Sequence, residues 1–510
     1  MLAKVFSVSL IGLEAYPIEI EIDVSSGLPM VSMVGLPDPA VKESKERVKS
    51  AIKNSGYKYP SSRVTVNFAP ADIRKEGPAF DLPAALGILA ATEQIDPIRF
   101  KEYLIIGELS LNGEVRSVRG ALPIALFIKK NRGKKIILPF GNAEEAGIVE
   151  GIEVYPVRSL IDAVGFLSGD INITPCKVQT DESFTHSQKY EIDFAEVKGQ
   201  WFAKRALEIA AAGSHNMLMI GTPGSGKTML ASRLPTILPE MTLEESLETT
   251  MVYSAAGCLP FHQPLIGARP FRSVHHTASD ISLVGGGQVP KPGEISLAHN
   301  GVLFLDELPE FTRASLESLR QPLEERAITI SRAAKSLRYP SDFMLLAAMN
   351  PCPCGFLGDR KKQCHCSPSQ VQRYRAKISG PLLDRIDLHV EVPAVQPDDL
   401  MDGGESEKSA LIKGRVETAR ILQRERFKDF GLYCNSQMNH RQIKIFCQID
   451  AAGKNLLKMA INELGISARA YNKILKVART IADLFGQESI AAEHLAEAIQ
   501  YRALDKNVWT

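Results

Sequence analysis

The segment Gly221–Thr228, GTPGSGKT, limits the possible folds of this chain more than any other part of its sequence. The apolar run Asn216–Ile220 precedes it and is expected to be a buried parallel strand, and Leu230–Leu234 continues as a helix. The spacing is G-x-x-x-x-G-K-[ST] in the strand–loop–helix context that this motif requires. Its glycines allow successive backbone N–H groups to converge on phosphate oxygens. A turn that binds nothing would not need both Lys227 and Thr228, so the segment predicts an α/β domain that binds a nucleoside triphosphate.

Two further strands are expected to bring polar side chains to the same site. Gly301–Glu307 reads GVLFLDE, and its acids are predicted to hold Mg²⁺ through Asp306 and to activate the attacking water through Glu307. Phe343–Met349 ends at Asn350, whose amide is predicted to contact the γ-phosphate or that water. In the glycine-rich loop, Lys227 would reach the β- and γ-phosphates, and Thr228 would ligate Mg²⁺. The residues expected to bind ATP and its Mg²⁺ are Gly221, Thr222, Pro223, Gly224, Ser225, Gly226, Lys227, Thr228 and Asp306.

Arg385 is a candidate for a residue that acts between subunits. It lies in Gly380–Asp387, GPLLDRID, beside two acids. On spacing alone, a surface ion pair explains this arginine equally well. The alternative is an arginine finger, which stabilises charge at a neighbouring subunit's γ-phosphate and raises the rate by about 10³–10⁵. That alternative requires an oligomer.

The overall charge of the chain narrows the kinds of partner that it can have. Its 510 residues include 60 Lys and Arg and 59 Asp and Glu, for a net charge of +1. A protein coated in basic charge is excluded, so any contact with nucleic acid must use a local patch. No apolar run approaches the roughly 18 residues of a membrane span. The start of the chain alternates as a strand at Pro17–Val24 and shows no signal cleavage site, so we expect a cytoplasmic protein.

Two polar segments divide the chain into three expected domains. The domains are an N-terminal α+β domain at 1–168, a nucleotide-binding core at 192–395 that includes a cysteine cluster, and a helical domain at 409–510. The two polar segments between them are linkers at 169–191 and 396–408. In the helical domain, a buried helix face is predicted by the spacing of Ile474, Val477, Ala478, Ile481 and Leu484. Three basic residues share another face of that helix and are expected to be solvated, namely Lys473, Lys476 and Arg479.

Four of the eight cysteines fall between Cys352 and Cys366, as two C-x-C pairs. The pairs are Cys352 with Cys354 and Cys364 with Cys366. Four thiolates suit tetrahedral Zn²⁺, and His365 could replace one of them. The C-x-C spacing is tighter than the usual C-x₂-C, and reduced cysteines without a metal are the alternative. We favour a structural zinc site.

These segments resemble the AAA+ ATPases, and within them the magnesium-chelatase-like ComM/YifB family. The stretches that carry the resemblance are GTPGSGKT, Arg269–Phe311, AAMNPCPCG at Ala347–Gly355, SGPLLDRIDLHVEV at Ser379–Val392, and Ile466–Leu484. The resemblance implies a ring, a hexamer, with ATP between subunits. It makes Asn350 similar to sensor 1, Arg385 to a finger acting in trans, and Arg469 to the sensor-2 arginine of a helical lid. It also implies a DNA helicase that promotes branch migration of recombination intermediates in natural transformation.

Two loops are candidates for DNA contact by analogy with similar rings, including the MCM-type helicases. Gly285–Glu294, GGGQVPKPGE, favours a projecting loop because its glycines and prolines forbid a regular helix. A β-hairpin is predicted around Arg332–Ser336, where apolar residues alternate on both sides. By that analogy Lys291, Arg332 and Lys335 would contact phosphates regardless of base sequence. Without the resemblance, the sequence would favour ordinary solvated cations at these three positions.

The N-terminal domain resembles the Lon-type proteolytic domain, a fold of the ribosomal S5-like kind. In Lys75–Leu86 the position of that family's nucleophilic serine is Ala79, and in Gly107–Leu122 the position of its lysine is Leu122. A Ser–Lys dyad needs both the hydroxyl and the amine, and neighbouring serines with Lys75 do not recreate the spacing. We therefore expect a scaffold rather than a peptidase. The expected fold is a Lon-protease-like α+β domain, an AAA+ P-loop α/β core and a C-terminal helical lid.

A second function remains open on sequence alone. A chelatase-type motor would remodel a protein partner for metal insertion, and it would not be stimulated by DNA. The charged loops at Lys291 and Lys335 favour the DNA motor over this alternative. An ATP-dependent protease is disfavoured by the missing dyad.

Overall fold

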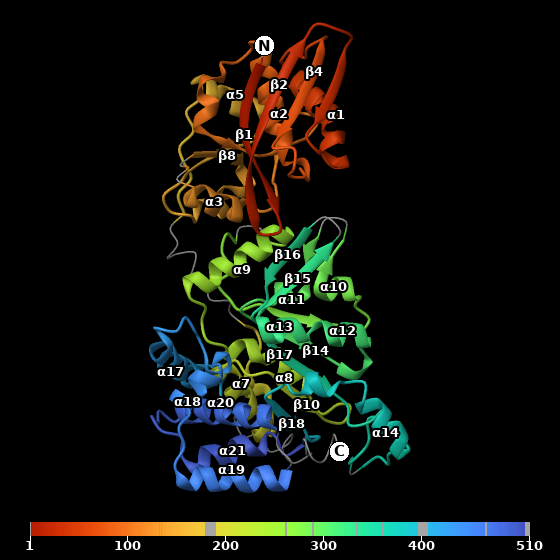
Figure 1. Cartoon of the computed structure of the whole chain (residues 1–510), viewed down its shortest axis with the longest axis vertical. Helices are drawn as coiled ribbons and strands as arrows, with labels where there is room; N and C mark the ends of the chain where they lie inside the picture. Colours follow the sequence, from red (N-terminus) through yellow and green to blue (C-terminus); the bar gives the residue numbers. More distant parts are fainter. Residues whose placement is uncertain are drawn as a thin grey trace. The chain divides into compact units, whose positions relative to one another are not determined.

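The computed structural model describes residues 2–131, 133, 135–178, 190–260, 263–287, 290–332, 335–359, 361–395, 406–464 and 467–504 (Figure 1). It divides into two compact units. Unit 1 comprises Met1–Ser187 with Leu243–Gly267, and unit 2 comprises Gln188–Thr242 with Ala268–Thr510. The nucleotide-binding core that we expected at 192–395 includes Leu243–Gly267, but this segment groups with unit 1. Among the described residues, no helix has the length and apolar character needed to cross a bilayer.

Unit 1 contains a four-stranded sheet in the order β1-β2-β4-β3. Its strands are β1 (Leu2–Ile11), β2 (Glu14–Ser25), β3 (Met30–Val34) and β4 (Arg63–Ala69). The predicted alternation in β2 is confirmed, because Ile18, Ile20 and Ile22 are buried while the residues between them are more exposed. The helices α1 (Pro39–Asn54) and α2 (Asp81–Ala91) pack together, and α2 lies against β1 and β2 with every residue buried.

The rest of unit 1 is built on a small parallel sheet in the order β5-β8-β9. Its strands are β5 (Leu104–Ile105), β8 (Lys135–Pro139) and β9 (Glu153–Val157), with a two-stranded ribbon of β6 (Glu108–Leu109) and β7 (Val115–Arg116). The helices are α3 (Ala121–Lys130), α4 (Ala143–Gly147), α5 (Leu160–Ser168) and α9 (Leu243–Ala256). Helix α9 packs on α3, which explains why this distant segment belongs to unit 1.

The two positions at which the Lon-type family carries its Ser–Lys dyad hold side chains without nucleophilic chemistry. Ala79 lies in the short 3₁₀ helix η1 (Pro78–Phe80), and Leu122 in α3 is fully buried. Lys75 is also buried, its ammonium donates to the Pro70 carbonyl oxygen, and burial lowers its pKa. These two positions therefore supply neither the hydroxyl nor the amine of a Ser–Lys dyad.

Unit 2 is organised around a five-stranded parallel sheet in the order β11-β14-β17-β10-β18. Its strands are β10 (Met217–Ile220), β11 (Phe271–Val274), β14 (Val302–Leu305), β17 (Met344–Met349) and β18 (Leu388–Glu391). All residues of β10, β14 and β17 are buried, as their apolar runs predict. Ile220 pairs with Met349 and Leu305 with Ala347, so the carboxyl ends of these three strands meet at one edge of the sheet.

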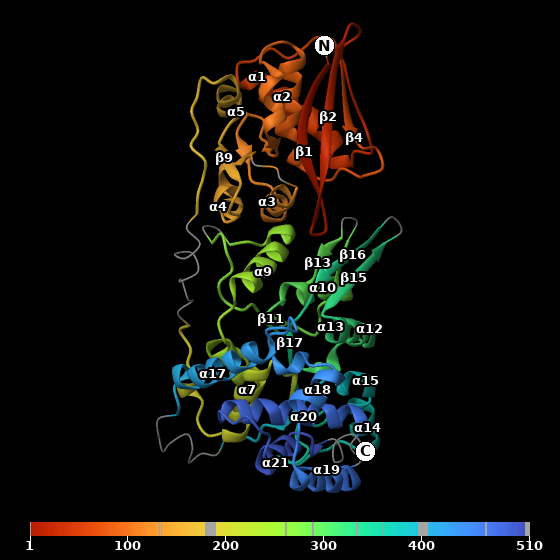
Figure 2. The same cartoon turned by 60° about the vertical axis from the view of Figure 1, so that its left-hand side comes forward.

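Helices and two antiparallel ribbons complete the core of unit 2 (Figures 1 and 2). The helices are α7 (Trp201–Gly213), α8 (Lys227–Arg233), α10 (Asp280–Val284), α11 (Glu294–Leu297), α12 (Arg313–Ser318), α13 (Arg320–Glu325), α14 (Pro368–Arg375) and α15 (Gly380–Leu383). One ribbon pairs β12 (Gly285–Gly286) with β13 (Lys291–Pro292), and the other pairs β15 (Ala327–Arg332) with β16 (Lys335–Pro340). The hairpin predicted around Arg332–Ser336 is confirmed by the second ribbon.

In the C-terminal part of unit 2, the described residues include five helices that form a bundle (Figure 2). They are α17 (Ser409–Phe427), α18 (His440–Phe446), α19 (Ala451–Leu464), α20 (Ala468–Leu484) and α21 (Ala492–Gln500). The predicted apolar face of α20 is confirmed, with Ile474 and Ile481 fully buried against neighbouring helices. Ser467 caps α20 by accepting a hydrogen bond from the Ala470 N–H.

The basic face of α20 is not solvated, contrary to expectation. Lys473 lies 2.7 Å from Asp387, which follows α15, and its side chain is only 15% exposed. Arg479 is 2% exposed, and its guanidinium pairs with Asp483 one turn later. Helical spacing places these cations on one face but does not show that acids of other segments cover it. Although burial alone would raise the pKa of Asp387, the charge of Lys473 holds it below its usual value.

Substitution of Asp387 is expected to destabilise unit 2 strongly. Asp387→Asn leaves the ammonium of Lys473 with no charged partner in a largely buried place, and the expected loss of unfolding free energy is about 3 kcal/mol. Asp384→Asn is the matched control, because its carboxylate is exposed and lies 3.5 Å from exposed Arg469. For Asp384→Asn, the loss of unfolding free energy should stay below about 1 kcal/mol. Urea titration measures both, and equal midpoints for the two variants would contradict the prediction.

Candidate ATP site and cysteine knuckle

The glycine-rich loop places its lysine at the centre of a set of oxygen acceptors. Lys227 Nζ donates to the carbonyl oxygens of Gly221 (2.7 Å) and Thr222 (3.0 Å), and lies 3.3 Å from Asn350 Oδ1. Gly226 precedes α8 with a φ of +86°, a left-handed conformation that favours glycine. Burial lowers the pKa of Lys227, and the nearby charges of the strand-end acids oppose that shift. The loop therefore holds an ammonium ready to meet phosphate oxygens.

The acids at the end of β14 lie beside this loop. Thr228 Oγ1 donates to Asp306 Oδ2 over 2.7 Å, which places two oxygen ligands of the kind that Mg²⁺ prefers next to each other. Glu307 has a φ of +52°, an uncommon conformation for a residue other than glycine, and its side chain is 49% exposed. Such strain is found at functional sites. The carboxylate lies 3.0 Å from His276 Nδ1.

His276 is the residue of this site that the sequence did not reveal. His276 follows β11, the neighbour of β14, and reaches Glu307 across the sheet edge. The sequence shows only a histidine pair after the short segment Phe271–Val274, and that pattern alone does not indicate a site.

A cavity of about 370 Å³ joins these elements, within the size range of small-molecule sites. Its lining residues are Pro223, Gly224, Gly226, Lys227, Thr228, Met229, Asp306, Glu307, Met349 and Asn350. Within the loop, Ser225 is fully buried, and Gly221 donates its N–H to the Met349 carbonyl oxygen. The structure thus brings the predicted loop, acids and asparagine to one hollow at the carboxyl edge of the sheet.

Arg385 and Arg469 lie at a different cavity, of about 430 Å³, which shares no lining residue with the first. Arg385 donates to the Pro381 carbonyl oxygen and pairs with Glu324 of α13. Arg469, in the first turn of α20, is 66% exposed beside Asp384. The two arginines therefore lie together, but away from the glycine-rich loop of their own chain.

The two ribbons of unit 2 touch each other. Tyr339 Oη of β16 donates to the Pro290 carbonyl oxygen beside β13 over 2.9 Å. Lys291 is exposed in β13. Arg332 and Lys335 form the last backbone pair of their ribbon, and their side chains lie outside the described part of the chain. Both candidate loops thus form hairpins on one part of unit 2.

The four clustered cysteines lie close enough to share one metal ion. We call residues 352–366, apart from Arg360, the cysteine knuckle. The Sγ atom of Cys352 lies 3.4 Å from that of Cys354 and 3.7 Å from that of Cys364, and all four Sγ atoms, including that of Cys366, lie within 4.8 Å of one another. Tetrahedral Zn²⁺ with Zn–S bonds of about 2.3 Å places its sulfurs roughly 3.8 Å apart.

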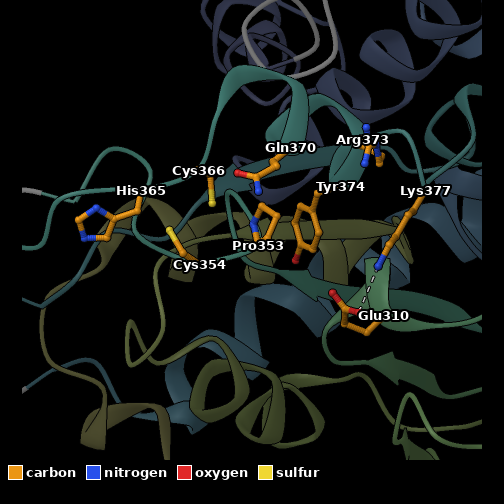
Figure 3. A pocket seen from close by; sticks show the side chains of 9 residues that line it. All are labelled: Glu310, Pro353, Cys354, His365, Cys366, Gln370, Arg373, Tyr374 and Lys377. Atoms are coloured by element: carbon orange, nitrogen blue, oxygen red, sulfur yellow. Dashed lines mark hydrogen bonds and ion pairs between the residues drawn. The ribbon is translucent and has the colours of Figure 1, made fainter.

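Backbone donors prepare the knuckle for a cation. N–H groups of Phe356 and His365 lower the pKa of the Cys354 thiol to about 6, which favours the thiolate that binds metals. At Cys364 and Cys366 the backbone donors are outweighed by burial and the neighbouring thiols, which raise the pKa of both thiols. In Figure 3 the sulfur atoms of Cys354 and Cys366 face each other, while the His365 ring extends away from them. The arrangement fits four sulfur ligands without the histidine.

The chain matches three family models in succession. They are described as "Magnesium chelatase, subunit ChlI" over residues 193–400, "Subunit ChlI of Mg-chelatase" over 20–142, and "Magnesium chelatase, subunit ChlI C-terminal" over 406–502. The chain is 46% identical to Competence protein ComM of Haemophilus influenzae over 507 residues, which cover 99% of this chain and 98% of that protein. It is 44% identical to the uncharacterized protein YifB of Escherichia coli K12, over 97% and 96% of the two chains.

Similarity to a magnesium chelatase itself is more limited. The Magnesium-chelatase 67 kDa subunit of Chlorobaculum parvum is 27% identical over 162 residues, which cover 31% of this chain and 23% of that subunit. The match to ComM and YifB, in contrast, extends through both units and both cavities. With the P-loop, the strand-end acids and the parallel sheet in place, the chain belongs to the magnesium-chelatase-like AAA+ family of ComM and YifB.

Proposed function

We propose that this protein is an ATP hydrolase that works as a ring, a hexamer, and moves along branched DNA. The observation that carries the proposal is the separation of Arg385 and Arg469 from the glycine-rich loop of the same chain. Among the described residues, the lining of the first cavity includes a loop, acids and an asparagine but no arginine, and a neighbouring subunit could complete such a site by supplying one. Because its relative is a competence protein, we place the activity in branch migration during natural transformation.

The residues around the first cavity divide the work of hydrolysis. Lys227 and the loop N–H groups hold the phosphates, and Thr228 with Asp306 supplies oxygen ligands for Mg²⁺, which would shield phosphate charge. Glu307 accepts a proton from the attacking water, and Asn350 orients that water. The Glu307 carboxylate lies 3.0 Å from His276 Nδ1, so it must move away from this ring, or turn beside it, to accept the proton.

The second cavity supplies the neighbour's part of the reaction. Arg385 and Arg469 would face the γ-phosphate held by the adjacent subunit and stabilise its developing charge. Arg385 must exchange Glu324 for phosphate oxygens, so the ion pair restrains the guanidinium until a neighbour docks. The C-terminal bundle, which bears Arg469, would act as a lid that couples nucleotide state to the ribbons.

DNA is the proposed track, and the paired ribbons are its proposed contact. Exposed Lys291 and the backbones of Arg332 and Lys335 lie on hairpins that touch through Tyr339. Lysine and arginine at hairpin tips bind phosphates without reading bases. A net charge of +1 is compatible with such a local patch.

DNA is expected to stimulate the ATPase, and loss of either ribbon lysine should reduce the stimulation. Lys291→Ala and Lys335→Ala each remove a proposed phosphate contact. In a plot of the logarithm of the DNA association constant against the logarithm of the salt concentration, the steepness of the slope should therefore fall by about 1. Lys458→Ala removes an exposed lysine of α19 and is the matched control. Steady-state ATPase with forked DNA and binding titrations at several salt concentrations measure these effects. An ATPase indifferent to DNA, with no binding at low salt, would instead favour a chelatase-type motor acting on a protein.

Further parts of the chain have proposed roles within this machine. Unit 1 is proposed to be a Lon-like scaffold without peptidase activity, since Ala79 and Leu122 replace the dyad. The cysteine knuckle is proposed to bind Zn²⁺ through Cys352, Cys354, Cys364 and Cys366. We propose a cytoplasmic location, where reduced thiols remain available as ligands.

A further inference from the structure

The cysteine knuckle is tied to the phosphate site at its first end. Cys352 comes two residues after Asn350, the last residue to line the nucleotide cavity along β17. Asn350 Oδ1 lies 3.3 Å from Lys227 Nζ. Any shift of the knuckle's first cysteine is therefore transmitted through one intervening residue to the asparagine that contacts the loop lysine.

The second end of the knuckle leads back to Pro351, the residue that follows this asparagine. Cys366 immediately precedes Ser367, whose hydroxyl caps α14 in a capping box with Gln370. From that helix, the Arg375 guanidinium donates to the Pro351 carbonyl oxygen over 3.2 and 3.3 Å. The chain therefore leaves the phosphate site at Asn350 and returns beside it at Arg375. We call the described residues between these two the strap; the parts on either side of its middle meet at the four thiols.

The knuckle also rests directly on the glycine-rich loop. Gly355 has a φ of +86°, and a methyl group added to it would lie 2.6 Å from Cγ and 2.7 Å from Cδ of Pro223. Distances below 3.0 Å require a shift, and a proline ring in a short loop has little freedom to move. Gly358, in the same knuckle and with a φ of +81°, has nothing within 4 Å of such a methyl group.

We propose that Zn²⁺ in the cysteine knuckle fastens the ATP site: it closes the strap that holds Asn350 beside Lys227 and seats Gly355 against Pro223. Gly355 and the four cysteines are then positioning residues, because they act through the loop and do not touch the nucleotide. The inference rests on the proposed ATP-binding function. It makes ATP affinity depend on the metal and on one van der Waals contact.

The pocket beside the knuckle gives reagents access to the metal in the folded protein. It has a volume of about 550 Å³, and Cys354 and Cys366 line one end of it (Figure 3). The ion pair between Lys377 and Glu310 lies at the other end. A zinc-selective chelator or a thiol reagent can therefore reach two of the four sulfurs without unfolding the chain.

The decisive comparison is Gly355→Ala against Gly358→Ala. Both substitutions place a side chain at a positive φ, so both carry the same backbone cost, but only the first meets Pro223. Affinity for a fluorescent ATP analogue should fall about tenfold or more in Gly355→Ala and change less than about twofold in Gly358→Ala. Both proteins should keep one zinc per chain by metal analysis. Equal affinities in the two variants would overturn the contact with Pro223.

A double substitution tests whether the effect passes through the loop. Pro223→Ala removes the atoms that the new methyl group would meet, so Gly355→Ala should cost much less in that background than in the wild type. An undiminished effect would overturn transmission through Pro223. Because the readout is ATP-analogue binding, it holds even if DNA neither binds nor stimulates, and that result would remove only the proposed DNA function.

Metal removal tests whether zinc in the cysteine knuckle is needed for ATP affinity. Zinc released by a zinc-selective chelator, in excess Mg²⁺, should lower ATP-analogue affinity in step with release, and zinc chloride should restore it. Cys354→Ser should show the same loss with substoichiometric zinc. Purified protein with well under one zinc per chain, or full ATP affinity after zinc release, would overturn the proposal.

Discussion

Glu307→Gln is expected to slow ATP hydrolysis by about 10²–10⁴-fold while leaving ATP binding intact. The amide keeps the shape of the side chain but cannot accept a proton from the attacking water. Glu307 lines the cavity with its carboxylate half exposed, whereas the proposed phosphate contacts belong to other residues, the Lys227 ammonium and the glycine-rich loop. Single-turnover hydrolysis measures the chemical step, and ATP-analogue titration measures the affinity.

Glu310→Gln is the matched control for that substitution. Glu310 lies three residues further on, and its exposed carboxylate pairs with Lys377 rather than lining the cavity. Its hydrolysis rate should stay within about twofold of the wild type. If Glu307→Gln hydrolysed ATP as fast as Glu310→Gln, another group would have to be the base, and His276 would be the first to test.

Local patterns were sufficient to predict the parts of the site that each strand carries. The strand before Gly221, the acids after Leu305 and the asparagine after Met349 each follow an uninterrupted apolar run. Because a parallel sheet brings the carboxyl ends of its strands together, their convergence followed from topology. The hairpin around Arg332–Ser336 was likewise predictable from the alternating apolar residues on both sides of it.

Contacts between distant segments were not predictable in the same way. The burial of Lys473 depends on Asp387, which lies 86 residues earlier and on another element. The approach of Gly355 to Pro223 joins two loops that share no periodic pattern. Helical spacing assigns residues to a face, but it does not say what covers that face, and this explains why the basic side of α20 was expected to be solvated.

Arg385→Ala is expected to reduce hydrolysis by about 10³–10⁵-fold in the assembled protein, the range observed for arginine fingers. The guanidinium is held by Glu324 and Pro381 at a cavity separate from the chain's own glycine-rich loop, so its loss should leave ATP binding within that chain unchanged. Arg320→Ala is the matched control on the same helix as Glu324, because its exposed side chain only pairs with Glu317. It should keep nearly full activity.

Mixing two inactive variants distinguishes a shared site from a site within one chain. Lys227→Ala subunits lack the loop ammonium but keep Arg385, and Arg385→Ala subunits have the reverse defect. If the arginine acts on a neighbour, random assortment at equal ratio creates both intact halves at roughly one quarter of the subunit interfaces, and activity should recover to about that fraction. Activity no greater than the sum of the separate variants would show that Arg385 does not complete a neighbour's site, and the proposed ring mechanism would then fail at its central step.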